Sequence, residues 1–551
     1  MWRRPTVLIS LAVFASAVVY LLGNDRVGLF DRDEPRYAQT SRQMLESNPP
    51  DRVVPRLLDD VRTAKPVFIY WAQAASMALL GVGEFAARLP SALAMLAVLV
   101  LAGVFVARIA GLRRAAWTVF ILGSSALAVA AAKMCITDAV LLLWIAIAEG
   151  CLYAMYRGSR GLAVAVVLWL AVGLAGLTKG PVVVGVLLST MLVLAMLDVA
   201  SGWRSGDAWK RAVQWWRHTR PLLGLAILAA VVGPWLAAVH MRDPSFLKQS
   251  LWHDVFTRSV RPLEGHKGPP GFYLLTIWGT FTPWSLFLPT AIALSWKHRR
   301  LPPLRFALAA TAGPWVVWEF IQTKLVHYML PVFPALAFMT ADALVRCIRR
   351  QHNDIHTLLA RAAALAWALA VAIAGQLPWL AGRFFSPLPP SLHFAAAGIS
   401  LAALALGASV WWMMRAGRPA AAAICMGAGW MLVVALFYGA WLPQAEFLWL
   451  PRQIGAFLVA EGATRKGDVF MLDYDPDSLA FYQGGTIRRA RPDLLKTGDR
   501  NIPGRWLVMT ESLWNNLAPE IKDRLEIRRS WRGWDYASRG RIVTVVVVRR
   551  R

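Results

Sequence analysis

The chain has 551 residues, of which 57% are hydrophobic, whereas soluble domains contain roughly 45–50% apolar residues. Apolar runs of about 18–22 residues recur along the chain, which excludes an ordinary soluble fold and predicts a polytopic α-helical membrane protein. The net charge is +27, and part of it is expected from Lys and Arg in cytoplasmic loops. The remaining positive charge suggests phosphates or anionic membrane lipids as partners. Because the basic residues are dispersed among the spans, nucleic acid is a poor alternative.

Basic loops alternate with less basic ones, and this alternation predicts about thirteen transmembrane helices with the C-terminus outside. The first apolar run is read as a retained span whose basic end faces the cytoplasm, rather than as a cleaved signal peptide. The predicted spans lie near residues 5–23, 86–108, 115–133, 139–156, 161–177, 180–198, 221–240, 271–292, 304–321, 328–346, 358–377, 391–414 and 419–441.

The first external loop, residues 24–85, is predicted to carry two short helices. Residues 66–80 are apolar but fall short of the roughly 20 residues needed to cross a bilayer. We therefore expect a helix that lies in the interface or re-enters the membrane. The second short helix covers about residues 36–47, because Pro35 suits its first position and acids precede it.

The composition becomes polar after about residue 441, with short β-rich runs at 468–474, 505–510 and 541–550. A helix-like piece lies between the last two runs, at 511–525. This pattern predicts a small α/β soluble domain outside the membrane. The expected division is a catalytic membrane domain over residues 1–441 and a soluble domain over residues 442–551.

Three acids stand close together in the first external loop: Asp31, Asp33 and Glu34. A capped helix start explains one acid, since carboxylates favour a helix N-terminus. Three neighbouring carboxylates repel one another, which favours a nearby cation such as a metal, a lysine or a substrate amine. Asp138 is a further candidate on the same side of the membrane, although Thr137 and Asp138 also suit a helix cap.

Several basic and aromatic side chains are predicted to lie near these acids. Lys65 either snorkels to the interface or binds a phosphate. Arg88 is spaced to pair with Glu84 at i,i+4. Lys179 lies in an external hairpin, while Lys324, His327 and Tyr328 form an outer rim that a membrane-interface belt also explains.

The loop at 246–273 combines aromatic, basic and His residues ahead of a Pro-Pro break, which suits a lipid head group or a sugar phosphate. Arg258 is its phosphate-binding candidate. His266, with a remote acid such as Glu84, is a candidate ligand for a divalent metal. The spacing is not typical of a zinc motif, so we expect no required cofactor, with zinc or magnesium as the alternative.

The motifs "DRDEPRYAQTSRQMLES", "VPRLLDDVRTAKPVFIYW", "GEFAARLPSAL", "ITDAVLLLW", "GLTKGP", "WHDVFTRSV" and "KLVHYMLPVFP" occur in this order. This series resembles the lipid A aminoarabinose transferases, relatives of the protein O-mannosyltransferases in the GT-C class of glycosyltransferases. The resemblance covers most of the membrane region to about residue 345. One departure is Thr63-Ala64 before Lys65, where many relatives have an acid and an aromatic residue.

The resemblance implies transfer of 4-amino-4-deoxy-L-arabinose from undecaprenyl phosphate to a lipid A phosphate at the outer face of a bacterial inner membrane. It further implies polymyxin and cationic-peptide resistance, and we expect the chain to act as a monomer. The expected catalytic residues are Asp33, Asp138 and Glu34. The expected substrate- and phosphate-binding residues are Arg36, Tyr37, Lys65, Arg88, Arg258, Lys324 and Tyr328.

Two alternatives remain open from the residues. A related transferase that uses a protein or another glycan as acceptor would need a general base, for which Asp33 or Asp138 is available. A lipid transporter would instead place ionisable residues at mid-membrane and repeat its helices in two halves.

Overall fold

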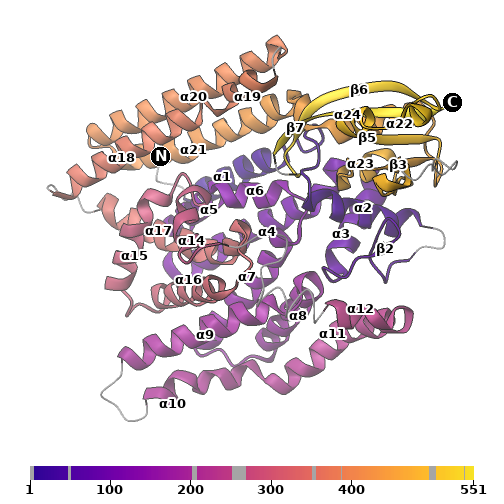
Figure 1. The fold of residues 1–551 in the computed structure, drawn as a ribbon. Coiled ribbons are helices and arrows are strands. Elements are labelled where there is room, and N and C mark those ends of the chain that lie inside the picture. The colour runs from indigo at the N-terminus through magenta and orange to yellow at the C-terminus, as the bar shows by residue number, and fades with distance from the viewer. Residues whose placement is uncertain are drawn as a thin grey trace.

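The computed structural model describes residues 5–47, 51–201, 208–250, 268–349, 355–385, 388–495, 504–538 and 540–551. In the described residues, helices predominate up to about residue 460, and a mixed sheet follows (Figure 1). The helices before residue 250 are α1 (Pro5–Leu21), α2 (Asp33–Glu46), α3 (Phe68–Leu80), α4 (Glu84–Ala110), α5 (Leu112–Ser124), α6 (Ala126–Lys133), α7 (Thr137–Tyr156), α8 (Leu162–Lys179), α9 (Val182–Ser201), α10 (Ala208–Val213), α11 (Pro221–Arg242) and α12 (Pro244–Lys248). The later ones are α14 (Phe272–Thr280), α15 (Leu288–Lys297), α16 (Pro302–Phe320), the 3₁₀ turn η4 (Val326–Val332), α17 (Phe333–Arg349), α18 (Ile355–Ala374), α19 (Leu377–Phe385), α20 (Pro390–Arg415), α21 (Pro419–Leu436), α22 (Leu450–Ala460), α23 (Asp477–Gln483), α24 (Glu511–Asn515) and α25 (Pro519–Lys522).

The membrane-protein class is confirmed. In the described part of the chain, nine helices are long and apolar enough to cross a membrane, or ten if the bent pair α5–α6 is one span. Helices occupy all thirteen predicted positions, but α1 has only 17 residues and the predicted span 271–292 is divided between α14 and α15. Large apolar side chains remain exposed on these helices, such as Leu222 at 83% and Phe320 at 79%, as expected of a lipid-facing surface.

The bend of 61° between α5 and α6 has a local cause. Ser124 and Ser125 donate their hydroxyls to carbonyl groups of the preceding turn, which competes with continued helix. The amide of Ala126 donates instead to the carbonyl of Thr282, 2.8 Å away, and the indole of Trp284 donates to Ser124 Oγ. The neighbouring segment therefore satisfies the groups that the break releases.

The first loop contains α2, a two-stranded hairpin of β1 (Arg56–Leu57) and β2 (Asp60–Val61), and α3. Both predicted short helices are thus confirmed as helices, while the interfacial position of α3 stays a prediction. Figure 1 shows α2 and α3 at the end of the helical part that the C-terminal sheet also occupies, with α23 next to α2.

The C-terminal sheet has the strand order β4-β3-β5-β7-β6, with β3 (Val469–Met471), β4 (Arg488–Arg489), β5 (Trp506–Thr510), β6 (Leu525–Asp535) and β7 (Arg541–Arg550). β3 runs parallel to β4 and β5, and β7 is antiparallel to β5 and β6. One face packs on α22 and α23, and the other packs on α24 and α25. The three predicted strands are confirmed, whereas the piece predicted as helix at 511–525 is two short helices followed by the start of β6.

Candidate functional site

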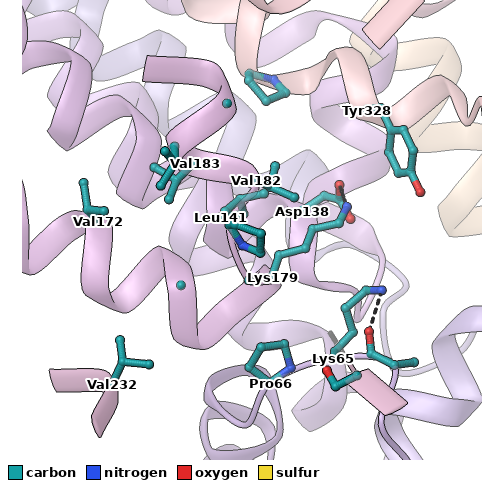
Figure 2. Close-up of a pocket in the computed structure, with 18 of the residues that line it drawn as sticks. Lys65, Pro66, Asp138, Leu141, Val172, Lys179, Val182, Val183, Val232 and Tyr328 are labelled. Atoms are coloured by element: carbon teal, nitrogen blue, oxygen red, sulfur yellow. Dashed lines mark hydrogen bonds and ion pairs between the residues drawn. The ribbon is translucent and has the colours of Figure 1, made fainter. Parts of the chain in front are cut away.

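A cavity of about 520 Å³ lies between α7, α8, α9, α11 and η4. Most of its wall is apolar, and Figure 2 shows Val172, Val183 and Val232 away from the polar residues. Its polar residues are Lys65, Asp138, Lys179, Thr323, Tyr328 and Ser250. The cavity therefore has an apolar region that suits a hydrocarbon chain and a charged region that suits a head group.

The charged region is organised around Asp138, which is only 6% exposed in the first turn of α7. Lys179, the last residue of α8, places its Nζ 2.6 Å from Asp138 Oδ1. His327 Nε2 lies 3.9 Å from Asp138 Oδ2, and Lys179 Nζ lies 4.8 Å from the ring centre of Tyr328. Because a buried carboxylate without a partner is costly, Asp138 and Lys179 stabilise each other here.

Lys65 brings a second ammonium group to the same region, as Figure 2 shows. Its Nζ donates to the carbonyl of Ala64 at 2.9 Å. Two lysines against one carboxylate leave the charged end of the cavity net positive when His327 is neutral. This arrangement favours an anionic group such as a phosphate.

Asp33 lies in the first turn of α2 and is exposed, and it is not among the residues that line this cavity. Tyr37, one turn later, is buried and stacks on Tyr70 with ring centres 5.8 Å apart. Burial raises the pKa of Tyr37, and Tyr70, Asp33 and Asp138 raise it further while Arg62 opposes them. The phenol of Tyr37 is thus within electrostatic range of both candidate carboxylates.

Glu34 and Arg88 form a fully enclosed ion pair. Arg88 Nη2 donates to Glu34 Oε2 at 2.7 Å, and Arg88 Nε donates to Oε1 at 2.9 Å. The remaining Arg88 donors bind the carbonyls of Asn24, Val27 and Gly28, and Glu34 also accepts from the amides of Phe30 and Cys135. The exposed fractions are 0% for Glu34 and 1% for Arg88, so this pair fixes the first loop and offers no group to a substrate.

The pairing predicted between Glu84 and Arg88 is therefore wrong. Glu84 instead lies 3.3 Å from Arg452 Nε and accepts from the hydroxyl of Tyr482 at 3.1 Å. Tertiary packing overrides the i,i+4 spacing because Arg88 points into the folded first loop, where several carbonyls need a donor. A predicted metal ligand is thus already engaged with a cation.

Two further predicted substrate-binding residues have protein partners. Arg36 Nε lies 2.6 Å from Asp477 Oδ2, so this side chain connects α2 to the C-terminal elements. Lys324 Nζ lies 2.8 Å from Glu319 Oε2, and Glu319 also accepts from the amides of Gly271 and Tyr273 at the start of α14. The structure does not bring either side chain to the wall of the cavity.

Arg258 and His266 lie outside the described residues. Within the described ranges, no group of three or more His, Cys, Asp or Glu side chains is arranged to hold a metal ion. The metal thus stays a prediction.

Lys179 and His327 are the residues whose importance the sequence analysis did not recognise. Both were noted at outer helix ends but were given no role. The available signal was a cation at the external end of a span in "LTKGP" and "KLVHYM". Only the packing of α8 and η4 against α7 shows that both reach Asp138.

Comparison with known proteins identifies similar sequences and a similar structure. The family model of dolichyl-phosphate-mannose-protein mannosyltransferases matches residues 6–246. Undecaprenyl phosphate-alpha-4-amino-4-deoxy-L-arabinose arabinosyl transferases from Pseudomonas paraeruginosa and Sodalis glossinidius are 29% identical over 350 residues and 30% identical over 385 residues, respectively. These alignments cover 62% and 67% of this chain, and 60% and 65% of the relatives, so the chain spans less than two thirds of their length.

The crystal structure of ArnT from Cupriavidus metallidurans bound to undecaprenyl phosphate has the same fold, with a TM-score of 0.75 over 98% of both chains at 21% identity. The fold and these similarities define a polytopic helical membrane protein that has the fold of the ArnT structure. The resemblance of the sequence to the aminoarabinose transferases is confirmed over the aligned part of the chain.

Proposed function

We propose that this protein transfers 4-amino-4-deoxy-L-arabinose from undecaprenyl phosphate to a phosphate of lipid A, at the periplasmic face of a bacterial inner membrane. The names of its relatives and the undecaprenyl phosphate in the similar crystal structure support this donor. The observation that carries the proposal is the cavity, in which an apolar wall is continuous with Lys65, Lys179 and Tyr328. A polyprenyl phosphate likewise combines an apolar chain with an anionic phosphate.

The first isoprenoid units of the donor would lie against the valines of α8, α9 and α11. This contact would keep the apolar surfaces of both away from water. Its phosphate would face Lys65 and Lys179, with the hydroxyl of Tyr328 as an additional hydrogen-bond donor. Negative charge accumulates on this phosphate as it leaves, so the ammonium groups stabilise the transition state more than the ground state. Arg258 is proposed as a further ligand of this phosphate.

The reaction would be a single displacement with inversion. A phosphate oxygen of the acceptor forms a bond to the anomeric carbon, and the bond from that carbon to the donor phosphate oxygen breaks. The electron pair leaves with undecaprenyl phosphate. Because the acceptor phosphate is already ionised at neutral pH, no general base is required. Asp33 would orient the acceptor or pair with the sugar amine, while Asp138 holds Lys179 in place.

The reaction would take place outside the cytoplasm. The soluble C-terminal part, residues 442–551, would lie in the periplasm, and the chain would act as a monomer. Attachment of an amine reduces the negative charge of lipid A, so resistance to polymyxin and cationic peptides would follow. A divalent metal near Glu84 and His266 would be an accessory and not the source of the nucleophile.

A second candidate function has one specific observation in its favour, the match of residues 6–246 to the protein mannosyltransferase family. In that case the acceptor would be a hydroxyl group of a protein or glycan, and a carboxylate would have to remove its proton. Asp33 is the candidate for this role because its side chain is exposed. Asp138, by contrast, is already paired with Lys179.

Mass spectrometry of lipid A tests the first function directly. Cells with the gene and cells without it would be compared, together with purified protein in liposomes that contain the aminoarabinose donor and lipid A. A mass increase of one aminopentose in both systems supports the first function. Unmodified lipid A in the liposomes, with a functional donor present, rejects it.

A further inference from the structure

His327 stands beside the charged end of the cavity, where Asp138, Lys179 and Tyr328 come together (Figure 2). It lies in η4, is partly exposed, and is not itself among the residues that line the cavity. The rings of His327 and Tyr328 meet edge to face, with centres 5.1 Å apart. The His327 Nε2 atom lies 3.9 Å from Asp138 Oδ2. The imidazole therefore adjoins two residues of the cavity wall.

Asp138 has different partners at its two carboxylate oxygens. Oδ1 is held by Lys179 Nζ at 2.6 Å, whereas Oδ2 accepts from the hydroxyl of Thr137 at 3.3 Å and lies near His327. The 3.9 Å between Oδ2 and Nε2 is too long for a hydrogen bond, so a neutral imidazole gains little from Asp138. A protonated imidazole would form an ion pair with a carboxylate that is almost fully buried. Protonation of His327 thus draws on the same carboxylate that holds Lys179.

The protonation state of His327 also decides the sign of the local charge. The charged groups that act most strongly on its ring are two ammonium groups and two carboxylates, those of Lys65, Lys179, Asp33 and Asp138. Counted together, with Asp33 outside the cavity wall, these four charges balance. A neutral His327 therefore leaves them balanced, and a protonated one adds an uncompensated positive charge.

The other titratable groups on the elements packed against η4 have partners of their own. Glu319 and Lys324, at the end of α16 and after it, pair with each other at 2.8 Å. Lys133 of α6 donates to two backbone carbonyls near the end of α1, and Asp342 of α17 pairs with two arginines. Tyr273 of α14 is a phenol, which is neutral near pH 7. Among all these groups, an imidazole is the one whose charge ordinarily changes near neutral pH.

We infer that His327 is a positioning residue for the phosphate of the polyprenyl substrate, and that it acts through Asp138 and Lys179. A lipid phosphate in the cavity would favour the protonated imidazole. The imidazolium would take up part of the Asp138 charge, which leaves the Lys179 ammonium group more available to the phosphate. Binding of the phosphate and binding of a proton to His327 would therefore strengthen each other.

The inference rests on the proposed function, because the donor there is a polyprenyl phosphate. The donor phosphate is a diester with one negative charge, and the departed monoester carries two above its second pKa of about 6. One more negative charge thus develops at this end of the cavity during the reaction, and no proton needs to move to the substrate. A protonated His327 would stabilise that charge in addition to the two lysines.

The test uses the full chain in phosphatidylcholine nanodiscs without acceptor. The probe is farnesyl methyl phosphate, a phosphodiester whose single negative charge does not change between pH 5.5 and pH 8. Calorimetry would measure its affinity at both pH values. We expect binding about tenfold tighter at pH 5.5, since coupling by one pKa unit corresponds to a factor of ten. Titrations at pH 7 in two buffers of different ionisation enthalpy should show net proton uptake.

Two variants assign the effect. His327→Gln keeps a polar side chain that cannot be protonated, so its affinity for the probe should no longer depend on pH in this range. His393→Gln is the matched control, because His393 is exposed near the start of α20 and does not line the cavity. This control should keep the pH dependence of the unmodified protein. Asp31, whose raised pKa of about 7 falls in the same range, is present in all three proteins and cannot cause a difference.

The outcomes separate the role of His327 from the function on which it rests. Equal pH dependence in the unmodified and His327→Gln proteins overturns the coupling, even where the probe binds well. Absence of proton uptake by the unmodified protein overturns it too, and this measurement decides the matter even if His327→Gln does not fold. No binding of the probe at either pH rejects the donor site, and the role of His327 with it.

Discussion

Lys179 Nζ lies 2.6 Å from Asp138 Oδ1, although the two residues are 41 positions apart and belong to different helices. The contact joins the C-terminal end of α8 to the N-terminal end of α7 at the charged end of the cavity that both residues line. A phosphate that enters this cavity meets an ammonium group already oriented by a buried carboxylate. Such preorganisation is what makes electrostatic stabilisation effective in a site of low polarity.

Replacement of Lys179 tests this arrangement. Lys179→Gln should reduce kcat for aminoarabinose transfer about 100- to 1,000-fold, the usual cost of removing one preorganised group that stabilises developing charge. Lys179→Arg should retain part of the activity. Steady-state kinetics in liposomes would measure both, with Lys466→Gln, an exposed lysine of the C-terminal part, as the control. A Lys179→Gln protein with normal kcat would show that the ammonium group does not face the leaving phosphate.

Asp33 is the acid whose role depends most on the acceptor. Asp33→Asn should lower transfer to lipid A and raise the KM for the acceptor, because an orienting or amine-pairing carboxylate acts on binding. If the acceptor were a hydroxyl, the same variant would lose kcat by 100-fold or more at unchanged KM. Asp25→Asn serves as the control, since Asp25 is an exposed acid of the same loop whose neighbour is Arg26. Full activity of Asp33→Asn with both acceptor types would show that Asp33 takes no part in the reaction.

The enclosed pair of Glu34 and Arg88 should behave as a structural element. Arg88→Met leaves the Glu34 carboxylate buried without its cation, which should destabilise the protein by about 3–5 kcal/mol. Thermal unfolding followed by tryptophan fluorescence would detect this, and Arg26→Met on the exposed surface is the matched control. The double variant Glu34→Leu with Arg88→Met should be less destabilised than the sum of the single ones. Additive effects would mean that the two side chains do not act as a pair.

Much of the fold follows from local sequence patterns, whereas the site depends on long-range packing. Apolar runs located a helix at every predicted span position, although only nine or ten of the described helices are long and apolar enough to cross a membrane. Pro35 with its preceding acids predicted the start region of α2, because these signals act within a few residues. β6 was missed because it is a charged edge strand in which most side chains face solvent. Nothing local indicates that Arg88 selects Glu34, 54 positions away, over Glu84. The cavity residues Lys65, Asp138 and Tyr328 were identified because charge and aromatic rings at helix ends are unusual enough to be noticed.

Asp31 should make the junction between the first loop and the C-terminal sheet sensitive to pH. Burial raises the pKa of Asp31 to about 7 from its ordinary value of 3.8, against the opposing effect of its bonds to Ser478, and the nearby charges of Asp477 and Asp535 raise it further. The folded protein therefore binds this proton more tightly than the unfolded chain does. The stability that this group contributes is fully present below pH 3.8 and is lost as the pH rises through 7.

The expected slope for this single group is at most about 1.4 kcal/mol per pH unit between these two values, since one proton is involved. Thermal unfolding in nanodiscs at pH 5, 6, 7 and 8 would measure it. Asp31→Asn keeps an oxygen that accepts from the amide of Ser478 and cannot titrate, so its melting temperature should fall less between pH 5 and pH 8 than that of the unmodified protein. Asp523→Asn should leave the pH dependence unchanged. Parallel curves for the Asp31→Asn and unmodified proteins would show that Asp31 is ionised throughout this range, and the junction would then have to accommodate its charge at every pH.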